Sequence, residues 1–296
     1  MNNLPREKQI AAISALCEGV SVRAAERLTG VNRGTILSLG VRVGEGCSKL
    51  HGAMMRNLQV TRIELDEIWG FVAKKQKQVK PEDGDMVGDQ YTFLALADTA
   101  KAIITYRTGK RTRENTQDFC DDLRRRVIGS PEISADGFQA YPWAISLAFG
   151  SDCKFGVVEK HYAAGGDSPE AARRYSPSDV VSVTRSVVTG VPTHISTSYV
   201  ERQNLTLRMQ QRRFTRLTNA FSKSYLNHCA AGALYVMHYN FCRVHEALRG
   251  TPAMQLGVAD HVWTISELVE AALNPHIPTA TGRNVGPFRV IDGGKI

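Results

Sequence analysis

The feature that most constrains the fold is a run of short, well-separated patterns between residues 60 and 158. Apolar residues alternate over the first of them, as is typical of a strand, and the later segments keep strand or helix spacing. In order, the patterns predict strands over 60–72, 91–97 and 102–106, a helix over 113–127, a strand over 131–136, a short helix over 143–149 and a strand over 154–158. Three strands followed by alternating helices and strands predict an α/β fold, in which helices flank a mixed β-sheet.

Three acidic residues occupy unusual positions in this pattern. Asp66 lies near the middle of the first strand, Asp136 ends the strand over 131–136, and Glu201 opens a later helix. An acid inside a strand is costly unless it is exposed, paired or bound to a metal. Each also has an ordinary alternative: a strand-edge or capping acid, an Asp-Gly turn, and a first-turn acid that complements the helix macrodipole. Because the three lie far apart in the sequence, only the fold can bring them together.

The helix that follows Glu201 belongs to a strongly basic segment. Between Arg202 and His245 there is no Asp or Glu. The Lys and Arg residues of this span are Arg202, Arg208, Arg212, Arg213, Arg216, Lys223 and Arg243, and the whole chain has a net charge of +8. Clustered positive charge favours an acidic partner, and nucleic acid is the commonest one for a basic protein. The alternative is a charge that serves only solubility.

Residues 5–45 predict three helices, with Gly30 and Asn32 marking the turn before the third. A short helix, a tight turn and a second helix form a helix-turn-helix pattern. In that interpretation the third helix presents Arg33 and Thr35 to DNA. A small helical bundle that touches no DNA has the same pattern, so both alternatives stay open.

Composition divides the rest of the chain. The glycines of residues 46–59 predict a linker between a domain over 1–45 and a larger domain over 60–256. Residues 163–198 are rich in Gly, Ser, Pro and Val, and we expect them to form an inserted hairpin or flap. Residues 257–296 predict a C-terminal helix and then a loosely ordered tail, because few core residues remain there.

The cysteines and the hydropathy pattern limit the class of protein. The chain has six scattered cysteines and no Cys-x-x-Cys pair, which disfavours a zinc ribbon and favours small core residues in a reduced compartment. No apolar run reaches membrane-spanning length, and the N-terminus lacks the apolar stretch of a signal peptide. We therefore expect a cytoplasmic protein without a membrane partner.

Four ordered motifs resemble those of bacterial insertion-sequence-one-type DDE transposases. The residues that carry the resemblance are Glu64–Val72 followed by Lys74 and Lys75, Asp136–Tyr141 in the form Asp-Gly-x-x-x-Tyr, residues 200–208 with 216–224 after them, and the closing motif over 239–253. Four motifs in the appropriate strand and helix positions are more specific than any one of them. The resemblance implies an N-terminal helix-turn-helix followed by a ribonuclease-H-like mixed β-sheet domain flanked by helices.

The resemblance also implies metal-dependent DNA strand cleavage and strand transfer at insertion-sequence ends. Asp66, Asp136 and Glu201 would then be the catalytic residues and the metal ligands. They would hold two Mg²⁺ ions, with Asp66 shared between them and Mn²⁺ as a substitute, because Mg²⁺ prefers carboxylate oxygens. Glu67 follows Asp66 directly, and since successive strand residues point to opposite faces, we interpret it as structural or surface.

The expected partners are double-stranded DNA, both as inverted-repeat ends and as target, and further copies of the chain in a homo-oligomer on DNA. This places the protein at the nucleoid of a bacterial cytoplasm. Asn204 and Arg208 share a helix face with Glu201 and can orient it or hold the scissile phosphate. The residues predicted to contact DNA are Asn204, Arg208, Arg212, Arg213, Arg216, Lys74, Lys75, Arg33 and Thr35.

Two other functions share these features. A ribonuclease-H-like nuclease or resolvase would use the same metals without strand transfer. A DNA-binding regulator derived from a transposase would keep the fold and lose the chemistry. The presence of all three acids and of the closing motif favours the transposase.

Overall fold

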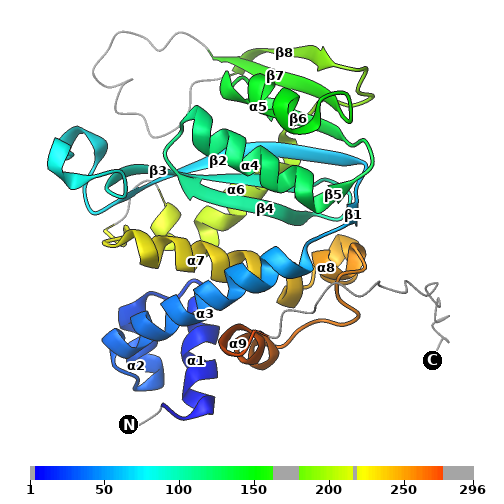
Figure 1. The fold of residues 1–296 in the computed structure, drawn as a ribbon. Coiled ribbons are helices and arrows are strands. Elements are labelled where there is room, and N and C mark those ends of the chain that lie inside the picture. Colours follow the sequence, from blue (N-terminus) through cyan, green and yellow to red (C-terminus); the bar gives the residue numbers. More distant parts are fainter. Residues whose placement is uncertain (1–3, 163–179, 216–218, 276–296) are drawn as a thin grey trace, which may run out of the picture.

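The computed structural model describes residues 4–162, 180–215 and 219–275 (Figure 1). Its centre is a six-stranded sheet in the order β4-β3-β2-β6-β7-β8. The strands are β2 (Arg62–Val72), β3 (Gly88–Ala97), β4 (Ala102–Gly109), β6 (Glu132–Asp136), β7 (Lys154–Tyr162) and β8 (Val180–Thr189), and a separate pair joins β1 (Leu58–Gln59) to β5 (Val127–Ile128). The predicted α/β architecture with a mixed sheet is confirmed.

Both strand directions occur in the sheet. β2 runs antiparallel to β3 and β3 to β4, whereas β6 runs parallel to both β2 and β7, and β8 returns antiparallel to β7. Parallel neighbours need a crossover connection, and α5 (Ala140–Phe149) makes it between β6 and β7. The helix α4 (Arg113–Arg126) leads from β4 towards β6. The sequence pattern therefore places β2, β3, β4, β6 and β7 in their observed order, but it does not include the short strand β5.

Helices cover both faces of the sheet, as alternation along β3 shows. Phe93 packs against Phe119 of α4, with ring centroids 5.6 Å apart. Its neighbour Leu94 points to the other face and joins a cluster with Val200 and Leu207 of α6 (Ser198–Gln210). The helix α7 (Tyr225–Met237) contributes to the same cluster. The central strand β3 is therefore covered on both faces, whereas the edge strand β8 is exposed along almost its whole length.

The N-terminal region contains α1 (Arg6–Cys17), α2 (Val22–Thr29) and α3 (Arg33–Met54). Gly30 ends α2 in the left-handed conformation, and the Asn32 side chain accepts a hydrogen bond from the backbone N–H of Gly34 at the start of α3. The three predicted helices are present. However, α3 continues to Met54, so residues 46–54 of the expected linker are helical.

The glycines of α3 explain why the expectation of a linker was wrong there. A Cβ atom on Gly44 would lie 2.6 Å from Cβ of Ala230 in α7, and one on Gly46 would overlap the backbone of Ala272 in α9 (Ile265–Leu273). These glycines let α3 approach two other helices closely. A glycine inside a helix commonly has such a packing reason, and the composition alone does not reveal it.

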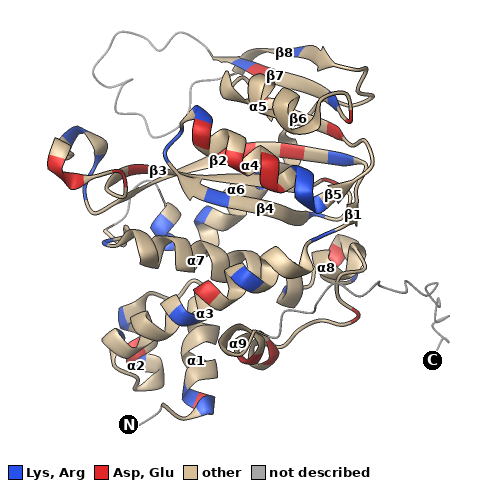
Figure 2. Cartoon of the chain, in the orientation of Figure 1, with Lys and Arg blue, Asp and Glu red and all other residues tan. Residues whose placement is uncertain are grey.

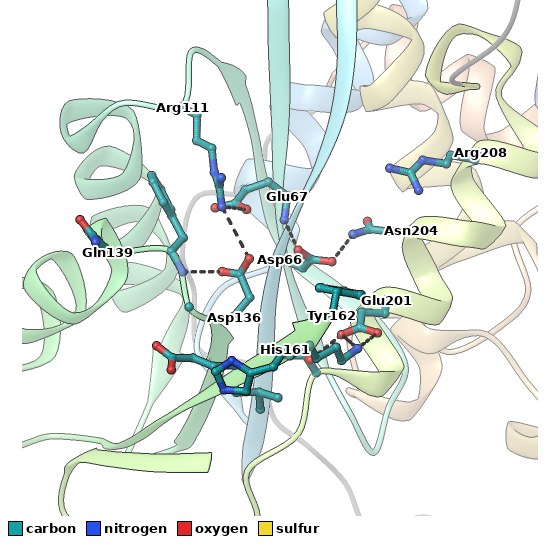
Figure 3. Close-up of a pocket in the computed structure, with 16 residues that line it drawn as sticks. Asp66, Glu67, Arg111, Asp136, Gln139, His161, Tyr162, Glu201, Asn204 and Arg208 are labelled. Atoms are coloured by element: carbon teal, nitrogen blue, oxygen red, sulfur yellow. Dashed lines mark hydrogen bonds and ion pairs between the residues drawn. The ribbon is translucent and has the colours of Figure 1, made fainter. Parts of the chain in front are cut away.

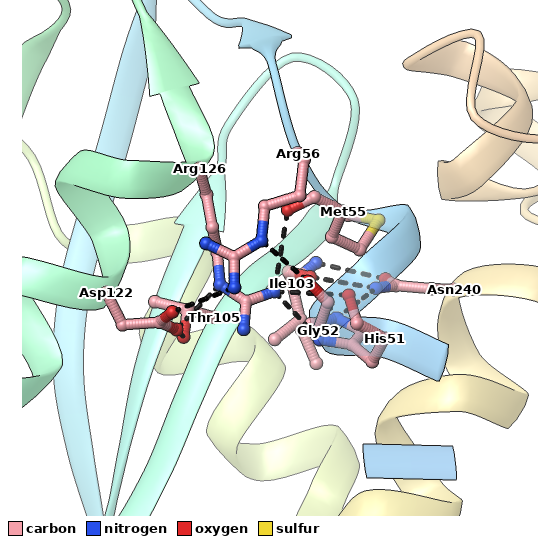
Figure 4. A network of polar contacts seen from close by, with 9 residues as sticks. All are labelled: His51, Gly52, Met55, Arg56, Ile103, Thr105, Asp122, Arg126 and Asn240. Atoms are coloured by element: carbon pink, nitrogen blue, oxygen red, sulfur yellow. Dashed lines mark hydrogen bonds and ion pairs between the residues drawn. The ribbon is translucent and has the colours of Figure 1, made fainter. Parts of the chain in front are cut away.

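A buried polar network also fixes α3 to the sheet (Figure 4). The Arg126 guanidinium donates to the backbone oxygen of His51 at 3.2 Å and pairs with Asp122 at 2.6 Å. Asn240 donates to the oxygen of Ile103 and accepts from its N–H, at 2.8 and 3.0 Å. Burial lowers the pKa of His51 to about 3, so its ring stays neutral. The network joins α3, α4, β4 and the closing motif, and its buried groups satisfy one another.

The remaining elements follow the predictions where they are described. The α7 helix passes into a π-helix (His238–Cys242), then come α8 (Pro252–Gln255) and α9, which is the C-terminal helix expected within residues 257–296. Short 3₁₀ turns span Gln76–Gln78, Pro81–Asp83, Arg212–Phe214 and Glu246–Leu248. Of the segment 163–198 expected to form a hairpin or flap, residues 180–189 form β8, which pairs with the preceding strand β7. Residues 163–179, and residues 276–296 of the predicted tail, lie outside the described residues. Within the described part of the chain, no helix is both long and apolar enough to span a membrane.

Candidate active site

A cleft of about 810 Å³ opens where β2, β6, β7 and α6 meet (Figure 3). The three sequence-predicted acids, Asp66, Asp136 and Glu201, all line it. The residues that line the cleft are Asp66, Glu67, Arg111, Asp136, Gly137, Phe138, Gln139, Val158, Glu159, Lys160, His161, Tyr162, Thr197, Glu201, Asn204 and Arg208. The fold therefore brings together residues that no local pattern joins.

Strand register explains why Asp66 and Asp136 are neighbours. In the parallel pair of β2 and β6, Leu65 is the partner of Ala135, and one further step along each strand reaches Asp66 and Asp136. Residues at equivalent positions of adjacent parallel strands point to the same side. β6 ends at Asp136 while β2 continues, so one edge of β2 is open from Asp66 onward. The cleft lies at this open edge.

Asp66 is held by neutral donors. Its Oδ1 accepts from the backbone N–H of Glu67 at 2.8 Å, and its Oδ2 accepts from the Asn204 amide at 2.7 Å. Burial raises the pKa of Asp66 to about 7, and the nearby Asp136 carboxylate adds to the shift. A carboxyl group with this pKa is poised to exchange its proton for a cation near neutral pH.

Asp136 ends its strand in a turn. Its Oδ1 accepts from the backbone N–H of Phe138 at 3.0 Å, and its Oδ2 lies 3.6 Å from the Arg111 guanidinium. Burial raises the pKa of this carboxyl group as well, against the lowering effects of the Phe138 N–H and of Arg111. The Asp-Gly turn expected as an ordinary alternative is thus present, and it aims the carboxylate into the cleft.

Glu67 belongs to the acidic group, although we interpreted it from the sequence as structural or surface. Its side chain is only 3% exposed and lies 3.3 Å from Arg111. Ligand atoms of Asp66, Glu67 and Asp136 all lie within 4.8 Å of one another. Burial raises the pKa of Glu67 to about 8, and the nearby Asp136 carboxylate makes the next largest contribution to this increase. The surface alternative is wrong because the edge of β2 is open here, so carboxylates from both faces reach the same place.

Glu201 is placed by an anchor at the start of α6. The Glu64 carboxylate of β2 accepts from the backbone N–H groups of Tyr199 and Val200, at 2.7 and 2.9 Å. The first N–H groups of a helix have no partner within it, and a carboxylate there also complements the macrodipole. Glu64 precedes Asp66 by two residues on the same face of β2, so this anchor sets Glu201 beside the acids. The Glu201 carboxylate accepts from Thr197 Oγ1 at 2.7 Å and pairs with Lys160.

Glu201 is thus close to the other acids but outside the compact group of three. The described residues contain one cluster with metal-ligand spacing, and its members are Asp66, Glu67 and Asp136. The predicted set was Asp66, Asp136 and Glu201. Sequence reasoning missed Glu67, Arg111 and Lys160. The motif over Glu64–Val72 contained a signal for Glu67, whereas nothing local pointed to the two cations.

A second cleft of about 1030 Å³ lies between the N-terminal helices and the start of α7. It is lined by Arg23 and Arg33 on one side and by Arg212, Arg213 and Lys223 on the other, and no Asp or Glu is among its described lining residues. By contrast, α4 carries both signs of charge on the outside of the sheet (Figure 2). Basic side chains from the N-terminal helices and from the segment after α6 therefore line one cavity.

The other predicted DNA contacts are scattered. Asn204 and Arg208 line the acidic cleft, and Thr35 is exposed near the start of α3. Lys74 pairs with Asp83 at 2.7 Å and, like the exposed Lys75, follows the end of β2 away from both clefts. Arg216 lies outside the described residues. The structure thus gathers only part of the predicted set.

Comparison with known proteins adds little to this geometry. No model of a known protein family matches the sequence, and no curated protein matches it. Among solved structures, the chain is similar to a piggyBac transposase in a synaptic complex with hairpin DNA, with a TM-score of 0.37 and 10% identity, over 92% of this chain and 72% of that one. At this level the two chains share too little for the function of one to be carried to the other.

Proposed function

We propose that this protein is a DDE-type transposase, which cleaves DNA strands and joins them to target DNA with divalent metal ions. The observation that carries the proposal is the convergence of Asp66, Asp136 and Glu201, from three separate elements, in one cleft. The strand order supports the ribonuclease-H-like interpretation. An antiparallel trio (β4-β3-β2) continues into parallel β6 and β7, with acids on the first strand, at the end of the fourth and on a later helix.

The donor set fits Mg²⁺. Its compact part consists of three carboxyl groups within 4.8 Å of one another, and no His or Cys belongs to it. Mg²⁺ prefers oxygen ligands. Burial raises the pKa values of all three groups, so their charged forms are costly without a cation. A divalent ion removes this cost.

The side chains of the cleft have separate roles in the proposed reaction. Asp66, Asp136 and Glu201 hold the ions, and the Asn204 amide orients Asp66 through its hydrogen bond. When bound, two Mg²⁺ ions activate the attacking water or 3′-hydroxyl and stabilise the leaving oxygen. Arg208, on the same side of α6, holds a phosphate beside the scissile bond.

The basic second cleft supports an extended DNA path. Arg33 comes from the N-terminal helices and Arg212 from the end of α6, and both line the same cavity. We infer that the duplex lies across this cavity with its scissile phosphate at Asp66, and that Thr35 faces its bases from a helix-turn-helix. Two DNA ends require two active sites, so a homo-oligomer assembles on the DNA.

The test uses a duplex with the genomic sequence that flanks the gene on either side, a target plasmid and Mg²⁺. We expect nicked ends and joined products, both lost in Asp66→Asn, Asp136→Asn and Glu201→Gln. The control variant Asp152→Asn changes an exposed acid outside the cleft and should keep both products. Cleavage without joining would instead identify a nuclease. Tight binding without any strand scission would identify a regulator, and either result overturns the proposal.

A further inference from the structure

Lys160 is the cation closest to Glu201 in the acidic cleft. Its ammonium group contacts both oxygens of the Glu201 carboxylate. The two side chains are 30% and 39% exposed, so the pair is reachable by solvent and by ions. Lys160 comes from β7 and Glu201, labelled in Figure 3, comes from α6, so the pair joins two elements that line the cleft.

The register of the sheet explains how Lys160 reaches this place. Val158 is the partner of Asp136 in the parallel pair of β6 and β7. Lys160 lies two residues further along β7, so it points to the same face as Val158. Its long, flexible stem then carries the ammonium group to Glu201. The contact therefore follows from the strand positions and is built into the site.

The carboxylates of the cleft differ in whether a cation is paired with them. Arg111 pairs with Glu67 and lies beside Asp136, and Lys160 pairs with Glu201. The Asp66 carboxylate accepts hydrogen bonds from the backbone N–H of Glu67 and from the Asn204 amide. Among the described residues it forms no ion pair. Asp66 is therefore a carboxylate of the cleft without a cationic partner among the described residues. It lies between the pair of Arg111 with Glu67 and the pair of Lys160 with Glu201.

An ion at Asp66 that also uses Glu201 competes with Lys160. The ammonium group occupies both oxygens of Glu201, and two cations at one carboxylate repel each other. Glu201 stands outside the compact group of three acids, and its carboxylate is paired with Lys160.

We propose that Glu201 exchanges Lys160 for a divalent metal ion, so that Lys160 is a positioning residue that balances the site until the ion enters. This inference rests on the metal site of the proposed function. Metal binding releases the ammonium group, which stays tethered to β7 in the cleft. Lys160 therefore lowers the apparent metal affinity of the free protein.

The first experiment measures Mn²⁺ and Mg²⁺ affinity by isothermal titration calorimetry, without DNA. Lys160→Met keeps the length of the side chain and removes the charge, and it should bind either ion about two- to fivefold more tightly than the wild type. Lys154→Met is the matched control, since Lys154 also lies on β7 and pairs with Glu132 at 3.4 Å, outside the cleft. Its affinity should equal that of the wild type.

The second experiment needs no variant. An amine-acetylating reagent is applied to the wild-type protein with and without Mn²⁺, and the modified lysines are quantified by mass spectrometry. Lys160 should react faster with Mn²⁺ present, while Lys154 should be unchanged.

The outcomes separate the two proposals. Equal or weaker binding by Lys160→Met, or unchanged acetylation of Lys160 in a wild-type protein that binds metal, overturns the exchange alone. A wild-type protein that binds neither ion overturns the metal centre itself, and with it the proposed function. If Lys160→Met does not fold by circular dichroism, the acetylation result decides.

Discussion

Asp66 and Glu67 are adjacent on β2, yet their carboxylates lie within 4.8 Å of each other and of Asp136. Alternation along a strand puts neighbouring side chains on opposite faces. Here β6 stops at Asp136, so the two side chains meet around the open edge of β2. Because these three partly buried carboxyl groups lie so close together, we expect protonation, metal binding and stability to be coupled.

The stability of the metal-free protein should fall as the pH rises. The pKa of Asp66 is raised from 3.8 to about 7 and that of Glu67 from 4.5 to about 8. Their protonated forms stabilise the folded state, fully below about pH 4, and this contribution is lost as the pH rises towards 8. We expect the double variant Asp66→Asn, Glu67→Gln to lose a few °C less in Tm between pH 5 and 9 than the wild type. Parallel curves in differential scanning calorimetry would contradict this.

Mg²⁺ should stabilise the protein more at high pH than at low pH. An ion at Asp66 must displace the proton of that carboxyl group, whose pKa is about 7, and its charge also favours loss of the proton from the adjacent Glu67, whose pKa is about 8. At a hundredfold excess over Kd the gain is about 2.7 kcal/mol. We expect a clear rise in Tm at pH 8.5, a small one at pH 5.5, and none at either pH for Asp66→Asn. Asp152→Asn serves as the control and should respond like the wild type.

Glu64 should matter for both stability and activity, although it is not expected to bind metal. Replacing it by Ala leaves the buried N–H groups of Tyr199 and Val200 without their acceptor, at a cost of about 1–3 kcal/mol. The start of α6 then shifts, and Glu201 with it. Urea denaturation and Mg²⁺-dependent strand cleavage should both be impaired. Glu45→Ala, an exposed acid on α3, should leave them unchanged.

The close approach of α3 to α7 can be tested on one helix. Gly44→Ala forces a methyl group against Ala230 and should destabilise the protein by about 1–3 kcal/mol. Gly40→Ala meets only Leu16 at an ordinary 3.5 Å and should stabilise it by about 0.5–1 kcal/mol through helix propensity. Equal urea midpoints for the two variants would show that α3 does not pack as described.

Removing cations from the second cleft should change the salt dependence of DNA binding. Arg33→Ala and Arg212→Ala each remove one lining cation. If each contacts a phosphate, the slope of log K against log salt falls by about 1 per substitution. Fluorescence anisotropy with a labelled duplex measures this slope. Lys49→Ala, on an exposed part of α3 outside the cleft, should leave it unaltered.

Short-range patterns were sufficient for much of the fold. The strand over residues 60–72, the cap at Asn32 and the Asp-Gly turn at Asp136 depend on neighbours in the chain, and all three are present. The linker prediction was wrong over residues 46–54 because the glycines of α3 pack closely against Ala230 and Ala272, which are far away in the sequence. Whether Asp66, Asp136 and Glu201 bind metal stays a prediction.

The sequence by itself determined the order of the elements, the positions of the three predicted acids along them and the basic character of the segment after Glu201, because each depends on residue type and local spacing. Only the tertiary structure decided which charges share the cleft. Glu67 enters it because β6 ends early, and Lys160 because β7 lies beside β6. Arg111 enters it because the chain after β4 brings its guanidinium over the ring of Phe138. Burial, register and strand length are properties of the whole sheet, and no local pattern contains them.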